Sequence, residues 1–138
     1  MVRLRSEAET RLWAARVGTN FQPGDVVLLR GELGSGKTTF VRGYLESLGL
    51  SEPVRSPSFN LVQVFETTPP VMHADLYRVK SAIGIGIEDY LDTHVCLIEW
   101  PENSGGFFET ESCWQIVFET HGAERTAKVS PPITSHSQ

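Results

Sequence analysis

The chain has 138 residues, with 17 acidic and 12 basic side chains and a formal net charge of −5 at pH 7. This length fits one domain with a single core, and an acidic chain without a lysine or arginine cluster is poorly suited to binding a nucleic-acid backbone by itself. No apolar run approaches the length of a membrane span, and residues 1–5 lack the apolar core of a signal peptide, so we expect a cytoplasmic protein.

The first segment predicts a helix of about three turns. Ser6 precedes Glu9 by three residues, which is the pattern of a capping box at a helix start. Apolar side chains then recur on one helical face until Gly18, where we expect the helix to end. Residues 20–24 have turn chemistry and lead into the first strand.

A phosphate-binding loop follows that strand. Residues 25–30 are typical of a short buried strand, residues 31–38 match G-x-x-x-x-G-K-[ST], and residues 39–48 predict a helix. The glycines let backbone N–H groups approach phosphate oxygens, and the positive end of the helix dipole adds to the attraction. Lys37 is expected to reach the β- and γ-phosphates, and the Thr38 hydroxyl to join a magnesium shell. The motif therefore predicts a nucleotide-binding protein.

The remainder of the chain predicts further strands. The expected strands are residues 61–65, 71–75, 94–100, 113–118 and 125–129. A short helix is expected at 87–91, after a stretch at 81–86 with weak signals, and Cys96 and Cys113 are expected to be buried free thiols. We predict a three-layer P-loop α/β fold, with a mostly parallel sheet and antiparallel strands added at an edge. Residues 1–130 form the single domain, and 131–138 a flexible tail.

Two carboxylates are candidates for the acidic partners that a P-loop needs. Glu99 follows a fully apolar run, the general form of a Walker B element, and Asp75 ends a weaker run of the same kind. Each is expected at the carboxyl end of a strand beside the P-loop strand. We assign Glu99, with Thr38, to Mg²⁺, and Asp75 to the orientation or deprotonation of water. A solvated strand end remains the alternative for either carboxylate.

Three other positions stay open between a structural and a functional role. One is a switch-like loop of Ser56, Pro57, Ser58 and Phe59. Many P-loop proteins carry a switch that senses the γ-phosphate here, but a Ser-Pro turn before a strand fits equally well. His73 could serve as a base, but it lies mid-strand without a visible partner and is interpreted as a packed histidine. Trp100 fits stacking on a ligand or partner as well as it fits burial.

Several separate stretches together resemble one family. Residues 31–40, the S-P-S-F loop at 56–59, H-A-D-L-Y-R at 73–78 and L-I-E-W-P at 97–101 are similar to the TsaE (YjeE) family, the bacterial ATPases of tRNA threonylcarbamoyladenosine biosynthesis. The likeness runs over about residues 6–129. The P-loop is shared by many proteins, whereas the last two stretches together are much more specific.

The resemblance implies ATP and Mg²⁺ as ligands. It implies Asp75 and Lys37 as catalytic residues, and Thr38 and Glu99 as metal ligands. The phosphate contacts that it implies are Gly34, Ser35, Gly36, Lys37, Thr38 and Thr39.

The resemblance also places Ser6 or Thr10 near the adenine and Arg125 near the nucleotide. It implies a TsaB–TsaD pair as the partner, with tRNA reached through those proteins. ATP hydrolysis, weak in the isolated protein, would reset that complex between rounds of modification. The family usually carries an acidic helix start where residues 81–86 stand here, so no contact is transferred to that stretch.

Two alternatives remain at this stage. A small-molecule P-loop kinase would need a lid with arginines and an acceptor pocket, for which the chain has little spare length. A nucleotide-dependent binding module with little turnover needs the same carboxylates as an ATPase. The choice of adenine over guanine follows from the resemblance alone.

Overall fold

The computed structural model describes residues 1–51 and 61–133. Within these residues the chain forms one seven-stranded sheet in the spatial order β1-β7-β6-β2-β5-β4-β3. The strands are β1 (Val2–Leu4), β2 (Val26–Arg30), β3 (Val62–Phe65), β4 (Val71–Asp75), β5 (Val95–Glu99), β6 (Trp114–His121) and β7 (Glu124–Ser130).

The middle of the sheet is parallel and its edges are antiparallel. β2 pairs in parallel with β5 and β6, and β5 pairs in parallel with β4. β3, β7 and β1 are added in antiparallel orientation, so three of the six pairings are parallel. This arrangement confirms the predicted P-loop-type α/β fold, with antiparallel strands at both edges. The strand β1 was not predicted from the sequence.

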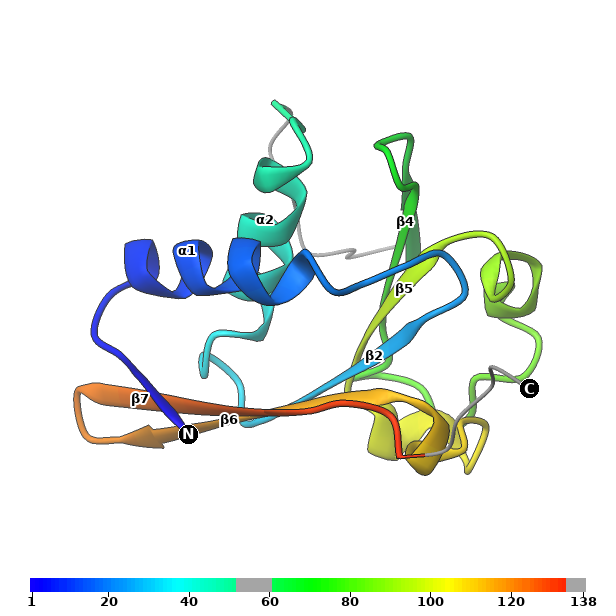
Figure 1. The fold of residues 1–138 in the computed structure, drawn as a ribbon. Helices are drawn as coiled ribbons and strands as arrows, with labels where there is room; N and C mark the ends of the chain where they lie inside the picture. Colours follow the sequence, from blue (N-terminus) through cyan, green and yellow to red (C-terminus); the bar gives the residue numbers. More distant parts are fainter. Residues whose placement is uncertain (52–60, 134–138) are drawn as a thin grey trace.

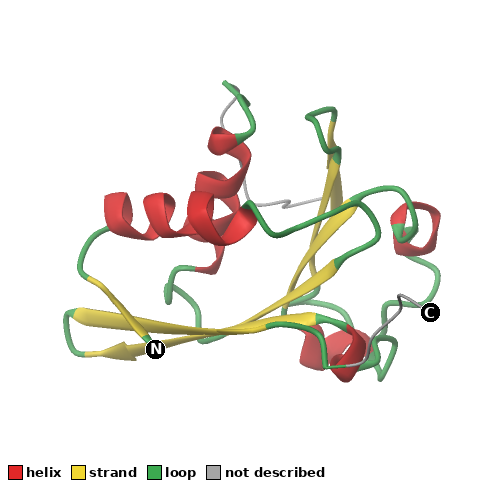
Figure 2. Cartoon of the chain, viewed as in Figure 1, coloured by secondary structure: helices red, strands yellow, loops and turns green. Residues whose placement is uncertain are grey.

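Two helices cover one face of the sheet, as Figures 1 and 2 show: α1 (Glu7–Gly18) and α2 (Lys37–Ser47). The Ser6 hydroxyl accepts a hydrogen bond from the Glu9 backbone N–H at 3.1 Å, which confirms the predicted helix cap. The helices pack closely at Gly43, where a Cβ atom would lie 2.5 Å from the Cα atom of Arg11. Among the described residues, no helix has the length and apolar character needed to cross a bilayer.

The opposite face is covered by short 3-10 segments and loops. These segments are η1 (Ile87–Tyr90), η2 (Pro101–Ser104) and η3 (Thr110–Ser112). They enclose a second core that includes Leu28 and Met72. Ala82 is buried in this core, and its N–H donates to the Ser104 carbonyl at 3.0 Å. The stretch 81–86 therefore packs on the face opposite α2.

The alternation of side chains along β4 decides what faces α2. Val71 belongs to the core beneath α2, and Met72 belongs to the opposite core. His73 and Asp75 share the parity of Val71, and Asp75 is paired in register with Glu99 on β5. Both carboxylates therefore point toward the face on which the P-loop enters α2.

Candidate phosphate-binding and metal-binding site

The loop between β2 and α2 has the backbone conformation of a tight glycine-rich turn. Gly36 is the N-cap of α2 with φ +119°, a left-handed value that side chains disfavour. A Cβ atom at Gly31 would lie 2.5 Å from the Ser35 hydroxyl oxygen. No described side chain caps α2, so the backbone N–H groups of its first turn are available to an anion.

The ammonium group of Lys37 lies in this loop, where the residue is 4% exposed. Its Nζ atom donates to the Gly31 carbonyl at 2.5 Å and lies 3.5 Å from the centroid of the Trp100 ring. Burial lowers the pKa of Lys37, while the charges of Glu99, Glu102 and Asp75 act in the opposite direction. Among the described residues, the ammonium group donates to one carbonyl, which leaves donor capacity for phosphate oxygens.

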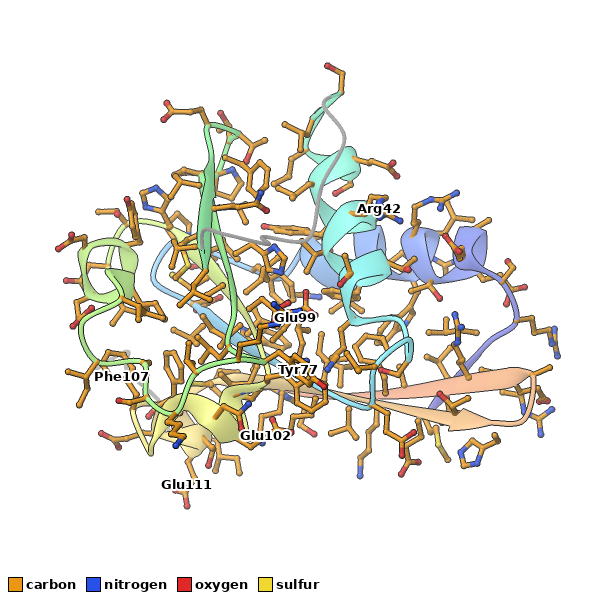
Figure 3. The ribbon with its side chains drawn as sticks, turned by 180° about the vertical axis from the view of Figure 1, so that it is seen from behind. Arg42, Tyr77, Glu99, Glu102, Phe107 and Glu111 are labelled. Carbon is orange, nitrogen blue, oxygen red and sulfur yellow. The ribbon has the colours of Figure 1, made fainter. Side chains whose placement is uncertain are left out.

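Glu99 lies directly beneath the first turn of α2. The Thr38 hydroxyl lies 3.3 Å from Oε1 and 3.2 Å from Oε2 of this carboxylate. The Nε2 atom of His73 lies 2.7 Å from Oε2. Figure 3 shows Glu99 near the middle of the molecule, between α2, which carries Arg42, and the segment that carries Glu102. Hydroxyl and carboxylate oxygens thus meet where the P-loop helix begins.

Asp75 lies beside Glu99 in the sheet. Its Oδ1 atom accepts a hydrogen bond from the Tyr77 backbone N–H at 3.0 Å. Burial raises the pKa of Asp75, and the charge of Glu99 raises it further, whereas the Tyr77 hydrogen bond and the charges of His73 and Lys37 lower it. The carboxyl group is therefore a stronger base than an aspartate in water.

A cavity of about 380 Å³ brings nine of the predicted residues together. It is lined by Gly34, Gly36, Lys37, Thr38, Thr39, Asp75, Glu99, Trp100 and Arg125. Glu7, Leu33 and Tyr77 also line it, although no role was predicted for them from the sequence. Glu7 is the first residue of α1, where an acidic side chain is favourable, and Tyr77 follows Asp75 by two positions. A single cleft thus contains the loop, both carboxylates and Arg125.

The other predicted site residues do not line this cavity or lie outside the described residues. The Ser6 hydroxyl caps α1, and the buried Thr10 hydroxyl donates to the Ser6 carbonyl at 3.2 Å, so neither side chain lines the cavity. The Ser35 hydroxyl is buried without a hydrogen-bond partner among the described residues. The switch-like loop of Ser56, Pro57, Ser58 and Phe59 lies outside the described residues.

A glycine-rich loop connects the parallel strand β2 of a mixed sheet to the helix α2. This arrangement defines a P-loop NTPase-like α/β protein. The family model described as "Threonylcarbamoyl adenosine biosynthesis protein TsaE" matches residues 4–128. The chain therefore belongs to the TsaE family.

Individual relatives agree with this membership. The tRNA threonylcarbamoyladenosine biosynthesis protein TsaE of Rickettsia typhi is 41% identical over 104 residues, which cover 72% of each chain. The protein of the same name from Treponema pallidum is 38% identical over 107 residues, covering 71% of this chain and 76% of that protein. The crystal structure of Bacillus subtilis YdiB superposes with a TM-score of 0.81 at 30% identity, covering 95% of this chain and 84% of that one.

Proposed function

We propose that this protein is a Mg²⁺-dependent ATPase of tRNA threonylcarbamoyladenosine biosynthesis. The proposal rests on one contact at the start of the P-loop helix, within the cavity. The Thr38 hydroxyl lies 3.3 Å from Oε1 and 3.2 Å from Oε2 of the Glu99 carboxylate. A P-loop protein holds Mg²⁺ with such a hydroxyl and a strand-end carboxylate.

The donor set fits Mg²⁺. Thr38 and Glu99 both offer oxygen atoms, and Mg²⁺ prefers few protein oxygens together with waters and phosphate oxygens. Within residues 1–51 and 61–133, no group of three His, Cys, Asp or Glu side chains could hold a metal ion by itself. This favours a site that the nucleotide helps to complete. When bound, the ion would neutralise charge on the β- and γ-phosphates.

The remaining cavity residues fit the binding and hydrolysis of a nucleoside triphosphate. Lys37 is already positioned in the loop and would exchange its Gly31 carbonyl contact for phosphate oxygens. Asp75 would accept a hydrogen bond from the attacking water, and its raised pKa makes it a better proton acceptor. Arg125 lines the same cavity and supplies a further positive charge toward the nucleotide.

The pathway follows from family membership. The relatives are named for tRNA threonylcarbamoyladenosine biosynthesis, and we assign this chain to the same process. We propose that it acts on a TsaB–TsaD complex and supports repeated rounds of modification. Its net charge of −5 is consistent with tRNA being held by the partners.

Phosphate release in the presence of Mg²⁺ or EDTA tests this proposal, with and without TsaB and TsaD. We expect slow release by the isolated protein and faster release with the partners. Thr38→Ser keeps a hydroxyl and should retain the Mg²⁺ dependence, whereas the nearly isosteric Thr38→Val should lose it. Phosphate transferred to a small acceptor would instead identify a kinase. Nucleotide-stimulated docking without turnover would identify a binding module.

A further inference from the structure

A buried hydrogen bond links two strands directly beneath the P-loop helix. His73 on β4 is 0% exposed, and the side chain of Glu99 on β5 is 4% exposed. The Nε2 atom of His73 lies 2.7 Å from Oε2 of Glu99. His73 is paired in register with Leu97, two residues before Glu99, so both side chains project from the same face of the sheet.

The chemistry of the contact fixes which atom donates. An ionised carboxylate only accepts hydrogen bonds, so the Nε2 atom of His73 must carry the hydrogen. The Thr38 hydroxyl approaches the same carboxylate from α2 at 3.2 and 3.3 Å. Glu99 is thus held from the sheet side by an imidazole N–H and faces a hydroxyl on the other side. Removal of the imidazole N–H would free the carboxylate to rotate away from Thr38.

We propose that His73 is a positioning residue that orients the Glu99 carboxylate toward the metal ion. This inference rests on the proposed Mg²⁺-dependent function. It replaces the interpretation of His73 as a packed strand histidine, because a packed histidine needs no specific contact with the carboxylate. The hydrogen bonds that hold a metal-ligating side chain contribute substantially to metal affinity, and their loss typically lowers affinity about 10- to 100-fold.

Two amide variants separate the hydrogen bond from the shape of the side chain. His73→Gln places an amide N–H near the former Nε2 position, whereas His73→Asn is one methylene shorter and withdraws that donor from Glu99. Val71→Ala is the matched control, because Val71 is fully buried on the same face of the same strand. It should lower stability without touching the carboxylate.

The measurement is Mn²⁺ binding in the presence of ADP, followed by electron paramagnetic resonance, with Mn²⁺ as a stand-in for Mg²⁺. ADP binding in EDTA and the melting temperature are measured alongside. We expect His73→Asn to weaken Mn²⁺ binding about 10- to 100-fold while ADP binding in EDTA is unchanged. His73→Gln should recover most of the Mn²⁺ affinity. Val71→Ala should lower the melting temperature and leave Mn²⁺ binding unchanged.

Equal Mn²⁺ affinity in His73→Asn and the wild type would overturn the inference, as would equal losses in the Gln and Asn variants. If His73→Asn does not fold, the inference is tested on the wild-type protein by nuclear magnetic resonance. The proton resonance of the His73 Nε2–H should then shift when Mg²⁺ is added to the ADP complex. An unchanged resonance overturns the inference. A wild type without metal-dependent nucleotide binding would contradict the proposed function itself, which distinguishes the two failures.

Discussion

Asp75 and Glu99 occupy directly paired positions at the ends of two neighbouring parallel strands, and both side chains point toward the P-loop helix. Glu99 lies on the strand adjacent to β2, which leads into the P-loop, and Asp75 lies one strand further away. Glu99 lies close to the Thr38 hydroxyl, whereas Asp75 accepts a hydrogen bond from the backbone N–H of Tyr77. This difference in surroundings supports a division of roles.

Amide variants test that division. Glu99→Gln should lose most of the Mg²⁺-dependent gain in nucleotide affinity, because one ligand oxygen becomes an amide nitrogen or a weaker carbonyl ligand. Asp75→Asn should keep that gain and lower turnover by about 10²- to 10⁴-fold, as expected for loss of a general base. Nucleotide titrations in Mg²⁺ and in EDTA, together with phosphate release, measure both effects. The reverse pattern would show that the two roles are exchanged.

Asp75 should also impose a pH dependence on stability. Burial raises the pKa of Asp75 in the folded state above its value in the unfolded chain. The contribution of Asp75 to the free energy of unfolding is therefore complete below the unfolded-state pKa. It is lost as the pH rises through the folded-state pKa. Asp75→Asn removes this loss. Urea denaturation should therefore show the variant gaining stability relative to the wild type as the pH rises above the usual pKa of an aspartate. A stability difference that is constant, or that slopes the other way, contradicts the assignment.

The two cysteines should be chemically inert in the folded protein. Both are free and buried, as predicted, and burial raises the pKa of Cys96 to about 12 and that of Cys113 to about 11. The thiolate is the reactive form, so iodoacetamide at pH 8 should label neither residue until the protein unfolds in urea. Leu12→Cys, at a position that is 61% exposed, provides an accessible control. Labelling of Cys96 in the native protein as fast as that of the control would contradict the burial.

Gly43 should not tolerate a methyl group, although alanine is normally the better helix former. An exposed helical Gly→Ala change is stabilising by about 1 kcal/mol. At Gly43 the new Cβ atom would lie 2.5 Å from Cα and 2.8 Å from the carbonyl oxygen of Arg11. We expect Gly43→Ala to destabilise by about 1–3 kcal/mol in urea denaturation, because α1 must move.

The matched control on the same helix is Glu46→Ala, which removes only a solvent-exposed ion pair with Arg11 at 3.5 Å. Its effect should stay within about 0.5 kcal/mol. A Gly43→Ala variant more stable than the wild type would show that the two helices are not in contact there.

The local pattern of apolar and turn-forming residues was sufficient to predict the secondary-structure elements that position the site. The strand at 25–30, the glycine-rich loop and the helix after it are β2, the P-loop and α2 (Lys37–Ser47). The apolar run before Glu99 is β5, adjacent to β2, and the strands expected at 113–118 and 125–129 lie within β6 and β7. These elements carry periodic apolar residues and strong turn signals over short distances.

Pairing between distant residues was not predictable in the same way. The three-residue β1 was missed because its position depends on β7, more than a hundred residues away in sequence. The contact of His73 with Glu99 depends on the register between β4 and β5, which no local pattern specifies. The same holds for Glu7, which reaches the cavity only because α1 packs against α2.

The most direct test of the central claim uses Lys37→Ala in tRNA threonylcarbamoylation with TsaB and TsaD present, counting modified tRNAs per complex. Lys37 is buried in the P-loop and lines the cavity, so its loss removes positive charge from the proposed phosphate site. Lys128→Ala, on the exposed side of β7, controls for loss of a lysine. We predict many rounds of modification with the wild type and Lys128→Ala, and about one round or fewer with Lys37→Ala. Unchanged multiple turnover with Lys37→Ala would contradict the account.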